Sequence, residues 1–428
     1  PMAISVVTML TLKFSLWSYL YLTTEMATCI ALATVLSFLS IGGFTQAIAR
    51  RGYFYISQSY YDMARRMTMH FIKLGYLSCF MVVIVFFLLN SFFRFFPLNM
   101  FFFLILYYFL LSAIWLSVTV MYILQKEIVF TALFLFGIGM VYVFFKIMLL
   151  DILIAQLISL VFVALVGLVF VVYYFYHMEK KMEKGIAAQL PKMSITLYTV
   201  MPYFSYGFLY FAFLYIDRIM AWSTNDVYMP YLIWFRGAYE LGLDFGILSL
   251  IIPLGINEVI INNFMAHLEV NEKNILASRM ASFTAMYRGK YLRSMSMAFG
   301  IAFVSGIATF FACRWFNDWI FTLGYERMIV NQSTWTVLII SLVSYCIISM
   351  SLLNAVTMFS LSNPHPINRT LITAVAVDLL VGFIMSRWFG YHYAVVGLLA
   401  GSLVFLIRST LQALETINEL DYYLYAAS

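Results

Sequence analysis

The feature of this sequence that most restricts its fold is a succession of long apolar stretches separated by short polar segments. A helix needs about 20 predominantly apolar residues to cross the hydrocarbon core of a bilayer. Only 10% of the residues are charged, whereas ordinary soluble domains contain roughly 25%. We therefore predict an all-α membrane protein with about twelve transmembrane helices, at residues 2–22, 26–49, 68–90, 100–124, 128–149, 152–177, 194–222, 230–265, 294–314, 332–361, 369–388 and 392–413.

The richest polar break inside the chain is 177-HMEKKMEKGIAAQLPK-192, between the sixth and seventh apolar stretches. It predicts an N-terminal six-helix lobe at 1–177, a cytoplasmic linker at 178–193 and a C-terminal six-helix lobe at 194–428. Paired halves of this kind are common among membrane transporters. Within the second lobe, residues 272–293 predict an amphipathic helix on the cytoplasmic surface of the membrane.

The Lys and Arg residues predict the orientation of the chain in the membrane. Most of them lie in one set of alternate loops, and the other set contains only Arg94, Arg314, Arg327 and Arg387. Loops rich in Lys and Arg stay on the cytoplasmic side. We therefore expect both termini to be cytoplasmic, in a multi-pass protein of a bacterial cytoplasmic membrane.

Two adjacent charges interrupt the seventh apolar stretch, in 208-FLYFAFLYIDRIMAW-222. Asp217 and Arg218 would point about 100° apart on a helix, so they cannot both face lipid. The simpler alternative is an ion pair near the end of the helix, with side chains that reach interfacial water.

The eighth stretch carries a stripe of charges. Arg236, Glu240 and Asp244 follow an i, i+4, i+8 spacing, which places all three on one face of a helix. Arg236 is in position to pair with Glu240, which leaves Asp244 to find another helix or water. Because such a face cannot lie in hydrocarbon, we expect it to line a polar cavity or to form a structural ion-pair network.

Single charges occur in three other apolar helices, at Lys13, Lys146 and Asp378. Each is weak evidence by itself, because a single charge near a helix end can reach the interface. Pairing of Lys13 or Lys146 with the acidic residues of the eighth helix would place all of them along a substrate path. We interpret the three as candidate cavity residues.

The motifs of common enzymes are missing from the sequence. It contains no GxxxxGK[ST] phosphate loop, no HExxH helix, no GxSxG turn and no cluster of Cys and His ligands. The basic residues are scattered and lack the aromatic interleaving of a nucleic-acid surface. We therefore expect a transporter and not an enzyme, with no cofactor, no metal and no nucleic-acid partner, embedded in the lipid bilayer.

Several segments resemble the multidrug/oligosaccharidyl-lipid/polysaccharide (MOP) flippase superfamily. The stretch 25-EMATCIALATVLSFLSIGGFTQAIARR-51 resembles its second helix, and 216-IDRIMAW-222 resembles the acidic-basic turn at the end of its seventh. More narrowly, 216-IDRIMAWS-223, 236-RGAYELGLDFGILSLIIPLGINEVI-260 and 114-IWLSVTVMYILQKEIVFTALFLFGIG-139 are similar to the Pel exopolysaccharide exporter family. This chain has Arg218 where that family commonly has Lys and Glu240 where it commonly has Asp, and both changes preserve the charge.

The resemblance implies two six-helix bundles that work by alternating access or by a path coupled to synthesis. It also implies export of a nascent polysaccharide, or flipping of a lipid-linked sugar, of the kind used in biofilms. A cytoplasmic glycosyltransferase and membrane partner proteins would then be the partners.

Two other hypotheses remain open at the level of the sequence. An ion-coupled exporter of small cations or drugs would use Glu240, Asp244 and Asp378 for cation coupling. A membrane scaffold of a polysaccharide synthase complex would instead contact its partners through the basic residues Lys180, Lys181, Arg288 and Lys290.

Overall fold

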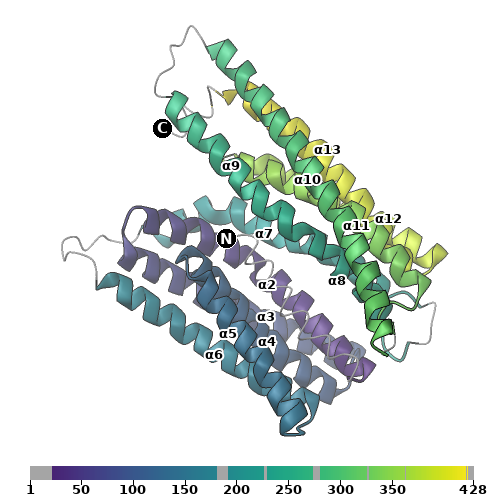
Figure 1. The fold of residues 1–428 in the computed structure, drawn as a ribbon. Helices are drawn as coiled ribbons and strands as arrows, with labels where there is room; N and C mark the ends of the chain where they lie inside the picture. Colours follow the sequence, from purple (N-terminus) through teal and green to yellow (C-terminus); the bar gives the residue numbers. More distant parts are fainter. Residues whose placement is uncertain are drawn as a thin grey trace. The chain divides into compact units, whose positions relative to one another are not determined.

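The computed structural model describes residues 22–180, 191–225, 229–272, 280–324, 327–361, 363–420 and 422, and nearly all of them are helical (Figure 1). The part of the chain before the predicted linker contains α2 (Thr24–Ser57), α3 (Tyr61–Phe93), α4 (Leu98–Ile123), α5 (Glu127–Tyr142), the π-helix η2 (Val143–Ile147) and α6 (Ile152–Glu179). These are followed by α7 (Met193–Trp222), α8 (Gly237–Ile247), the 3-10 helix η3 (Leu248–Leu250), α9 (Ile251–Glu272), α10 (Met280–Thr322), α11 (Gln332–Ser360), α12 (His365–Phe389), the 3-10 helix η5 (Tyr391–Ala394) and α13 (Val395–Asn418).

In the described part of the chain, eleven helical segments are long and apolar enough to cross a membrane. They correspond to the eleven predicted stretches from 26–49 to 392–413. The remaining predicted stretch, 2–22, lies outside the described residues, and Lys13 lies there with it. The prediction of an all-α, multi-pass membrane protein is confirmed by these helices. Helices suit a membrane because they satisfy within themselves the backbone hydrogen bonds that lipid cannot provide.

The contacts divide the chain into two compact units. Unit 1 contains the chain up to Ala212 together with Met229–Phe235, and unit 2 contains Phe213–Tyr228 and the chain from Arg236 onward. The last turns of α7 therefore belong to unit 2, whereas its preceding turns belong to unit 1. Residues 181–190 of the predicted linker lie outside the described residues.

Unit 1 is built around α2, which packs against α3 and α4. The ring of Phe38 lies 4.5 Å from the ring of Trp115 on α4 and 4.8 Å from that of Phe211 on α7. Gly42 of α2 and Gly207 of α7 bring the two helix backbones into direct contact, since a Cβ atom at Gly207 would overlap the carbonyl oxygen of Gly42. Small residues permit this close approach of helices in membrane proteins.

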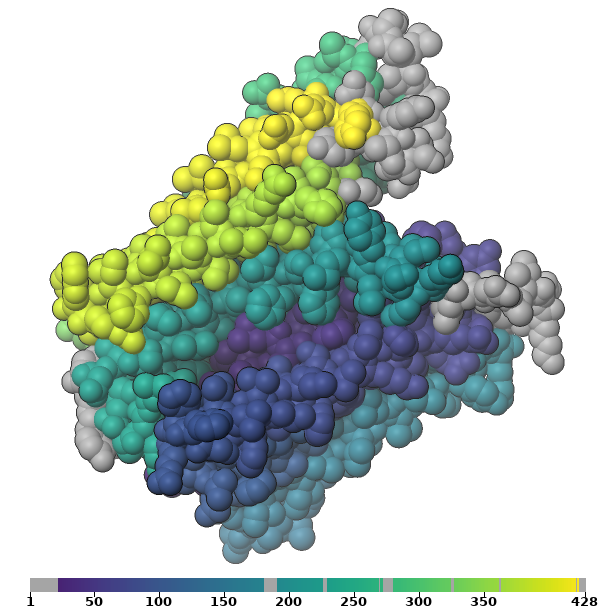
Figure 2. All heavy atoms as spheres, turned by 180° about the vertical axis from the view of Figure 1, so that it is seen from behind, coloured from purple at the N-terminus to yellow at the C-terminus, as the bar shows by residue number. Residues whose placement is uncertain are grey.

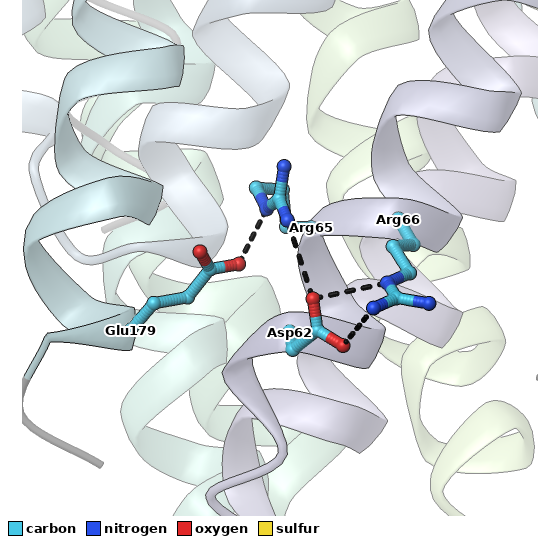
Figure 3. A network of polar contacts seen from close by, with 4 residues as sticks. All are labelled: Asp62, Arg65, Arg66 and Glu179. Atoms are coloured by element: carbon cyan, nitrogen blue, oxygen red, sulfur yellow. Dashed lines mark hydrogen bonds and ion pairs between the residues drawn. The ribbon is translucent and has the colours of Figure 1, made fainter. Parts of the chain in front are cut away.

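An ion-pair network joins the start of α3 to the end of α6 within unit 1 (Figure 3). Arg65 lies between Asp62 of its own helix, at 3.2 Å, and Glu179 of α6, with which it also pairs. Arg66 pairs with the same Asp62 at 2.9 Å. All four side chains are partly exposed, so each pair contributes about 1 kcal/mol or less to stability. The network orients the ends of the two helices.

In unit 2, α13 packs against α11 and α12, and Figure 2 shows α12 and α13 side by side. A buried amide joins three of the helices. Asn354 of α11 accepts a hydrogen bond from Tyr291 of α10 at 2.7 Å and donates to Ser409 and Thr410 of α13, each at 3.0 Å. The buried amide thus uses its oxygen as an acceptor and its NH₂ group as a donor.

The eighth predicted stretch is a helix with a 3-10 turn inside it. It begins as α8 at Gly237, passes through the 3-10 turn η3 and continues as α9. Before this turn, α8 packs closely on α11, because a Cβ atom at Gly242 would lie 2.8 Å from the Thr334 carbonyl oxygen. A 3-10 turn in the middle of a helix often marks a functional position.

The predicted surface helix at 272–293 is not a separate element in its described part. From Met280 the chain is one continuous helix, α10, of 43 residues, drawn as one uninterrupted ribbon in Figure 1. The apolar face of this segment packs on α9, because Tyr287 stacks edge-on against Phe264 at 5.6 Å and donates to the His267 carbonyl at 2.8 Å. In its described part, this segment packs one side against α9.

Two buried asparagines stabilise the chain where long helices end. Asn317 of α10 donates to the carbonyl of Ile329 at 3.2 Å and accepts from its N–H at 2.9 Å. Asn90 of α3 bonds to both backbone groups of Phe96 in the same way, at 3.1 and 2.8 Å. In each case the side-chain amide takes the place of a strand or helix partner for a non-helical segment.

We expect Asn317→Asp to destabilise the protein by about 1–3 kcal/mol, because the carboxylate cannot donate to Ile329 and is buried with a charge. Thermal unfolding of the purified protein, followed by tryptophan fluorescence, measures the effect. Asn331→Asp is the matched control, since Asn331 is exposed and makes no side-chain capping bond. The free energy of unfolding of this control should stay within about 0.5 kcal/mol of the wild-type value. Equal losses of stability in both variants would contradict the role of the Asn317 amide in holding Ile329.

Candidate functional site

A cluster of buried charges lies where the last turns of α7 meet α8, inside unit 2. Asp217 and Arg218 of α7 are 0% and 2% exposed, and Glu240 and Asp244 of α8 are each 7% exposed. Charged side chains inside a membrane-spanning bundle are costly, so they pair with one another and mark functional sites. This cluster is the candidate site.

Arg218 is the centre of the cluster. Its guanidinium forms an ion pair with Glu240 and lies 3.5 Å from the carboxylate of Asp244. The two acids are one turn apart on α8, so both face the same side of that helix and reach one planar guanidinium. The ring of Tyr215 lies 5.1 Å from the guanidinium and adds a cation–π contact.

The structure corrects the pairing expected for Arg236. Its predicted partner Glu240 pairs with the guanidinium of α7 described above, whereas Arg236 donates to the carbonyl of Thr224 at 2.7 Å and lies 5.2 Å from the ring of Tyr391. The reason is local: Arg236 precedes the first helical residue, Gly237, and its backbone is not helical (φ −110°, ψ 86°). The i, i+4 geometry of a helix therefore does not extend back to it.

Asp217 faces a different set of partners from Arg218, as their angular separation on α7 requires. Tyr239 of α8 donates its hydroxyl to the Asp217 carboxylate at 2.8 Å. Asp378 of α12 is close enough to Asp217 for the two carboxyl groups to interact electrostatically. Both residues of the Asp217–Arg218 pair are buried, so they do not reach the protein surface as an interfacial pair would.

Asp378 is also fully buried, at 0% exposed, and so the structure brings it to the edge of the same cluster. Lys146, which was predicted to line the cavity, is an exposed residue of unit 1 in the π-helix η2, 5.4 Å from the ring of Phe145. Lys13 lies outside the described residues.

Three of the predicted partner-facing residues are described, one just after α6 and two in the first turns of α10. Lys180 follows the end of α6, where its ammonium group lies 4.6 Å from the ring of Tyr176, and Lys181 is outside the described residues. Arg288 is exposed on α10, and Lys290 is half-buried with its ammonium 5.1 Å from the ring of Tyr287.

Arg387 of α12 is a site residue that the sequence analysis assigned only to an outer loop. Its guanidinium donates to the carbonyls of Met220 and Ser223, at 2.8 and 3.1 Å, and to the Thr224 hydroxyl at 2.8 Å. These are the groups at the C-terminal end of α7, where cations are favoured by the helix dipole. Tyr239 was missed as well, although a hydroxyl between two charged positions of an apolar run was a usable signal.

The fold is similar to those of solved MATE transporters. A point mutant of the Vibrio cholerae MATE transporter VcmN aligns with a TM-score of 0.67 at 12% sequence identity, over 99% of this chain and 96% of that chain. The outward-facing conformation of a multidrug resistance MATE family transporter of the MOP superfamily gives a TM-score of 0.62 at 14% identity, over 99% and 95% of the chains. A MATE protein in complex with MaL6 gives 0.61 at 15% identity, over 98% and 94%.

At these identities the likeness shows the fold alone, an all-α fold similar to that of the MATE transporter structures named above. No protein-family model matches the sequence, and no curated protein sequence matches it either.

Proposed function

We propose that this chain is a membrane exporter that works by alternating access. The observation that carries the proposal is the buried ion cluster of Arg218, Glu240 and Asp244, beside a helix that contains a 3-10 turn. Intramembrane charges are typical of the substrate and coupling-ion sites of secondary transporters. Paired acids that can exchange one counter-ion for another offer a cation-dependent switch.

The first candidate cargo is a small organic molecule, exported in exchange for a cation. Two observations favour it: the fold neighbours include a multidrug resistance transporter, and the cluster contains more acids than bases. In this proposal Glu240 and Asp244 line the substrate path, and Arg236 positions the start of α8 beside it.

The second candidate cargo is a polysaccharide or lipid-linked sugar. The segments that resemble Pel exporters, 216–223 and 236–260, are also the segments that build the buried cluster. In this proposal a cytoplasmic glycosyltransferase and membrane proteins would dock on the basic residues Lys180, Arg288 and Lys290 at the cytoplasmic side of a bacterial membrane.

Transport by everted membrane vesicles, with ethidium as the probe and an imposed pH gradient, tests the first candidate. We expect wild-type vesicles to accumulate ethidium and Asp244→Asn to lower the initial rate by roughly tenfold, the order of a coupling free energy of 1–3 kcal/mol. The control is Glu415→Gln, because Glu415 is exposed on α13 and far along the chain from the cluster. It should transport as the wild type does.

The second candidate predicts a different result. Ethidium would not accumulate, and deletion of the gene in the native host would stop polymer from appearing outside the cell while intracellular synthesis continued. A folded protein that moves ethidium in no condition, and whose deletion leaves extracellular polymer unchanged, would contradict the proposal of an exporter.

A further inference from the structure

One face of α3, in unit 1, is exposed over much of its length. Its side chains recur every three or four residues, so at about 100° per residue they lie within about 40° of one line along the helix. They are Arg66, His70, Lys73, Leu77, Phe80, Ile84 and Leu88, and all are exposed. The first three are basic and the last four are apolar. We call these seven residues the α3 strip.

The change from basic to apolar residues falls at the boundary of the hydrocarbon. The helix α3 has 33 residues and is about 50 Å long, whereas the hydrocarbon core of a bilayer is about 30 Å thick. The twenty residues from 74 to 93 contain no Asp, Glu, Lys, Arg or His, and they span about 30 Å of helix. Lys73 therefore lies at the edge of the hydrocarbon, and His70 and Arg66 lie about 5 and about 10 Å further out, among the lipid headgroups.

The ion-pair network of Figure 3 fixes the basic end of the α3 strip. It contains two acids and two guanidinium groups, so its charges offset one another. Arg66 uses Nε and Nη2 to bind Asp62, at 3.0 and 2.9 Å, which leaves its Nη1 for another acceptor. Because Arg65 ties the same turn of α3 to Glu179 of α6, the turn is held in place. An anion at this end would therefore meet a donor that is already oriented.

Beyond this network the α3 strip carries basic groups without an acidic partner. Among the residues that the structure describes, the side chains of His70 and Lys73 form no hydrogen bond and no ion pair. A lysine at the membrane boundary lays its stem along apolar surface and places its ammonium group among the headgroups. Anionic lipids attract basic residues at this level. An anionic headgroup therefore complements the basic end of the strip, and an acyl chain complements its apolar end.

We propose that the α3 strip binds one anionic phospholipid of the surrounding bilayer. The phosphate oxygens accept hydrogen bonds from Arg66, His70 and Lys73, and one acyl chain lies along Leu77 and Phe80. A zwitterionic phospholipid has the same acyl chains without the net negative charge, and inorganic phosphate has the charge without the chains. Only an anionic lipid matches both ends of the strip. This lipid site does not depend on the cargo or on the proposed function.

Native mass spectrometry of the purified full-length protein measures lipid binding directly. The probes are dioleoyl phosphatidylglycerol, which is anionic, and dioleoyl phosphatidylethanolamine, which is zwitterionic. We expect tighter one-to-one binding of phosphatidylglycerol, and Lys73→Gln should weaken that binding by about fivefold. Lys192→Gln is the matched control, because Lys192 is an exposed lysine of the same unit that lies just before α7 and outside the α3 strip. This control should bind phosphatidylglycerol as the wild type does.

Two further variants test the role of the basic groups. Lys73→Arg should keep the preference for phosphatidylglycerol, whereas His70→Gln combined with Lys73→Gln should weaken binding more than Lys73→Gln alone. Equal affinities for the two lipids, or equal losses in Lys73→Gln and Lys192→Gln, would overturn the proposal, because the attraction would then not belong to the α3 strip. Displacement of the bound lipid by excess inorganic phosphate would also overturn it, since the acyl chain would then contribute nothing.

Discussion

Replacing Arg218 with leucine should destabilise the protein by roughly 3–5 kcal/mol, the usual cost of leaving buried charges without their partner. The guanidinium forms an ion pair with both Glu240 and Asp244, so one substitution removes an ion pair from two buried carboxylates. Thermal unfolding in nanodiscs measures the loss. The control is Arg66→Leu, which removes a half-exposed pair with Asp62 and should cost about 1 kcal/mol or less.

A repair experiment separates lost charge pairing from lost packing at this position. Combining Arg218→Leu with Glu240→Gln and Asp244→Asn removes the guanidinium and both of its acids together. We expect this triple variant to recover most of the stability, because neutral groups are cheaper to bury than unpaired charges. If it is as unstable as Arg218→Leu alone, the stability comes from the shape of the arginine and not from its charge.

Replacing Gly207 with alanine should destabilise unit 1 by about 1–3 kcal/mol, the typical cost of overpacking a tight interior. The new Cβ atom would overlap the backbone carbonyl of Gly42. Alanine at Gly42 would likewise place a Cβ atom 2.9 Å from the Gly207 carbonyl oxygen. A backbone atom cannot rotate away as a side chain can, so the two helices must separate. Unfolding in nanodiscs measures the change.

Gly139→Ala is the matched control for this close approach. Gly139 lies in α5 of the same unit, and a Cβ atom there would meet nothing within 4 Å. Since alanine favours helix over glycine, the control should be neutral or more stable by up to about 1 kcal/mol. A Gly207→Ala variant as stable as Gly139→Ala would show that α2 and α7 are not in backbone contact.

The spanning helices could be predicted from the sequence because their length and apolarity are local properties. The bilayer demands a helix wherever about 20 apolar residues follow one another, whatever the rest of the chain does. The start of α8 was beyond this reasoning: the stripe from Arg236 to Asp244 fits one helix, but the helix begins after Arg236. The guanidinium of Arg236 instead binds the carbonyl of Thr224, in the segment that follows α7.

The continuity of α10 could not be predicted from local patterns. Residues after 280 show an apolar face, and such a face can pack on a membrane surface or on a neighbouring helix. The contact of Tyr287 with α9 comes from a residue outside the segment, so no property of the segment itself predicts it.

The acids and Arg218 of the candidate site could be predicted from the sequence alone. A charge inside an apolar stretch is conspicuous, so Asp217, Arg218, Glu240 and Asp378 stand out without any knowledge of their neighbours. Which of them meet could not be predicted, because the partners come from α7, α8 and α12. Arg387 shows the limit most clearly, since its position beside a loop concealed four contacts with the end of α7.

The continuity of α10 gives the molecule a mechanical reporter. Its 43 residues span about 65 Å at about 1.5 Å per residue, roughly twice the hydrocarbon thickness of a bilayer. The remaining length is divided between the two ends of the helix; the predicted span 294–314 leaves about 20 Å on the N-terminal side, and a tilt of about 10° would sweep that end through about 3 Å. Gly289 lies on this extension with open space around it, so a spin label there would convert small rotations of the spanning part into displacements that pulsed spectroscopy can resolve.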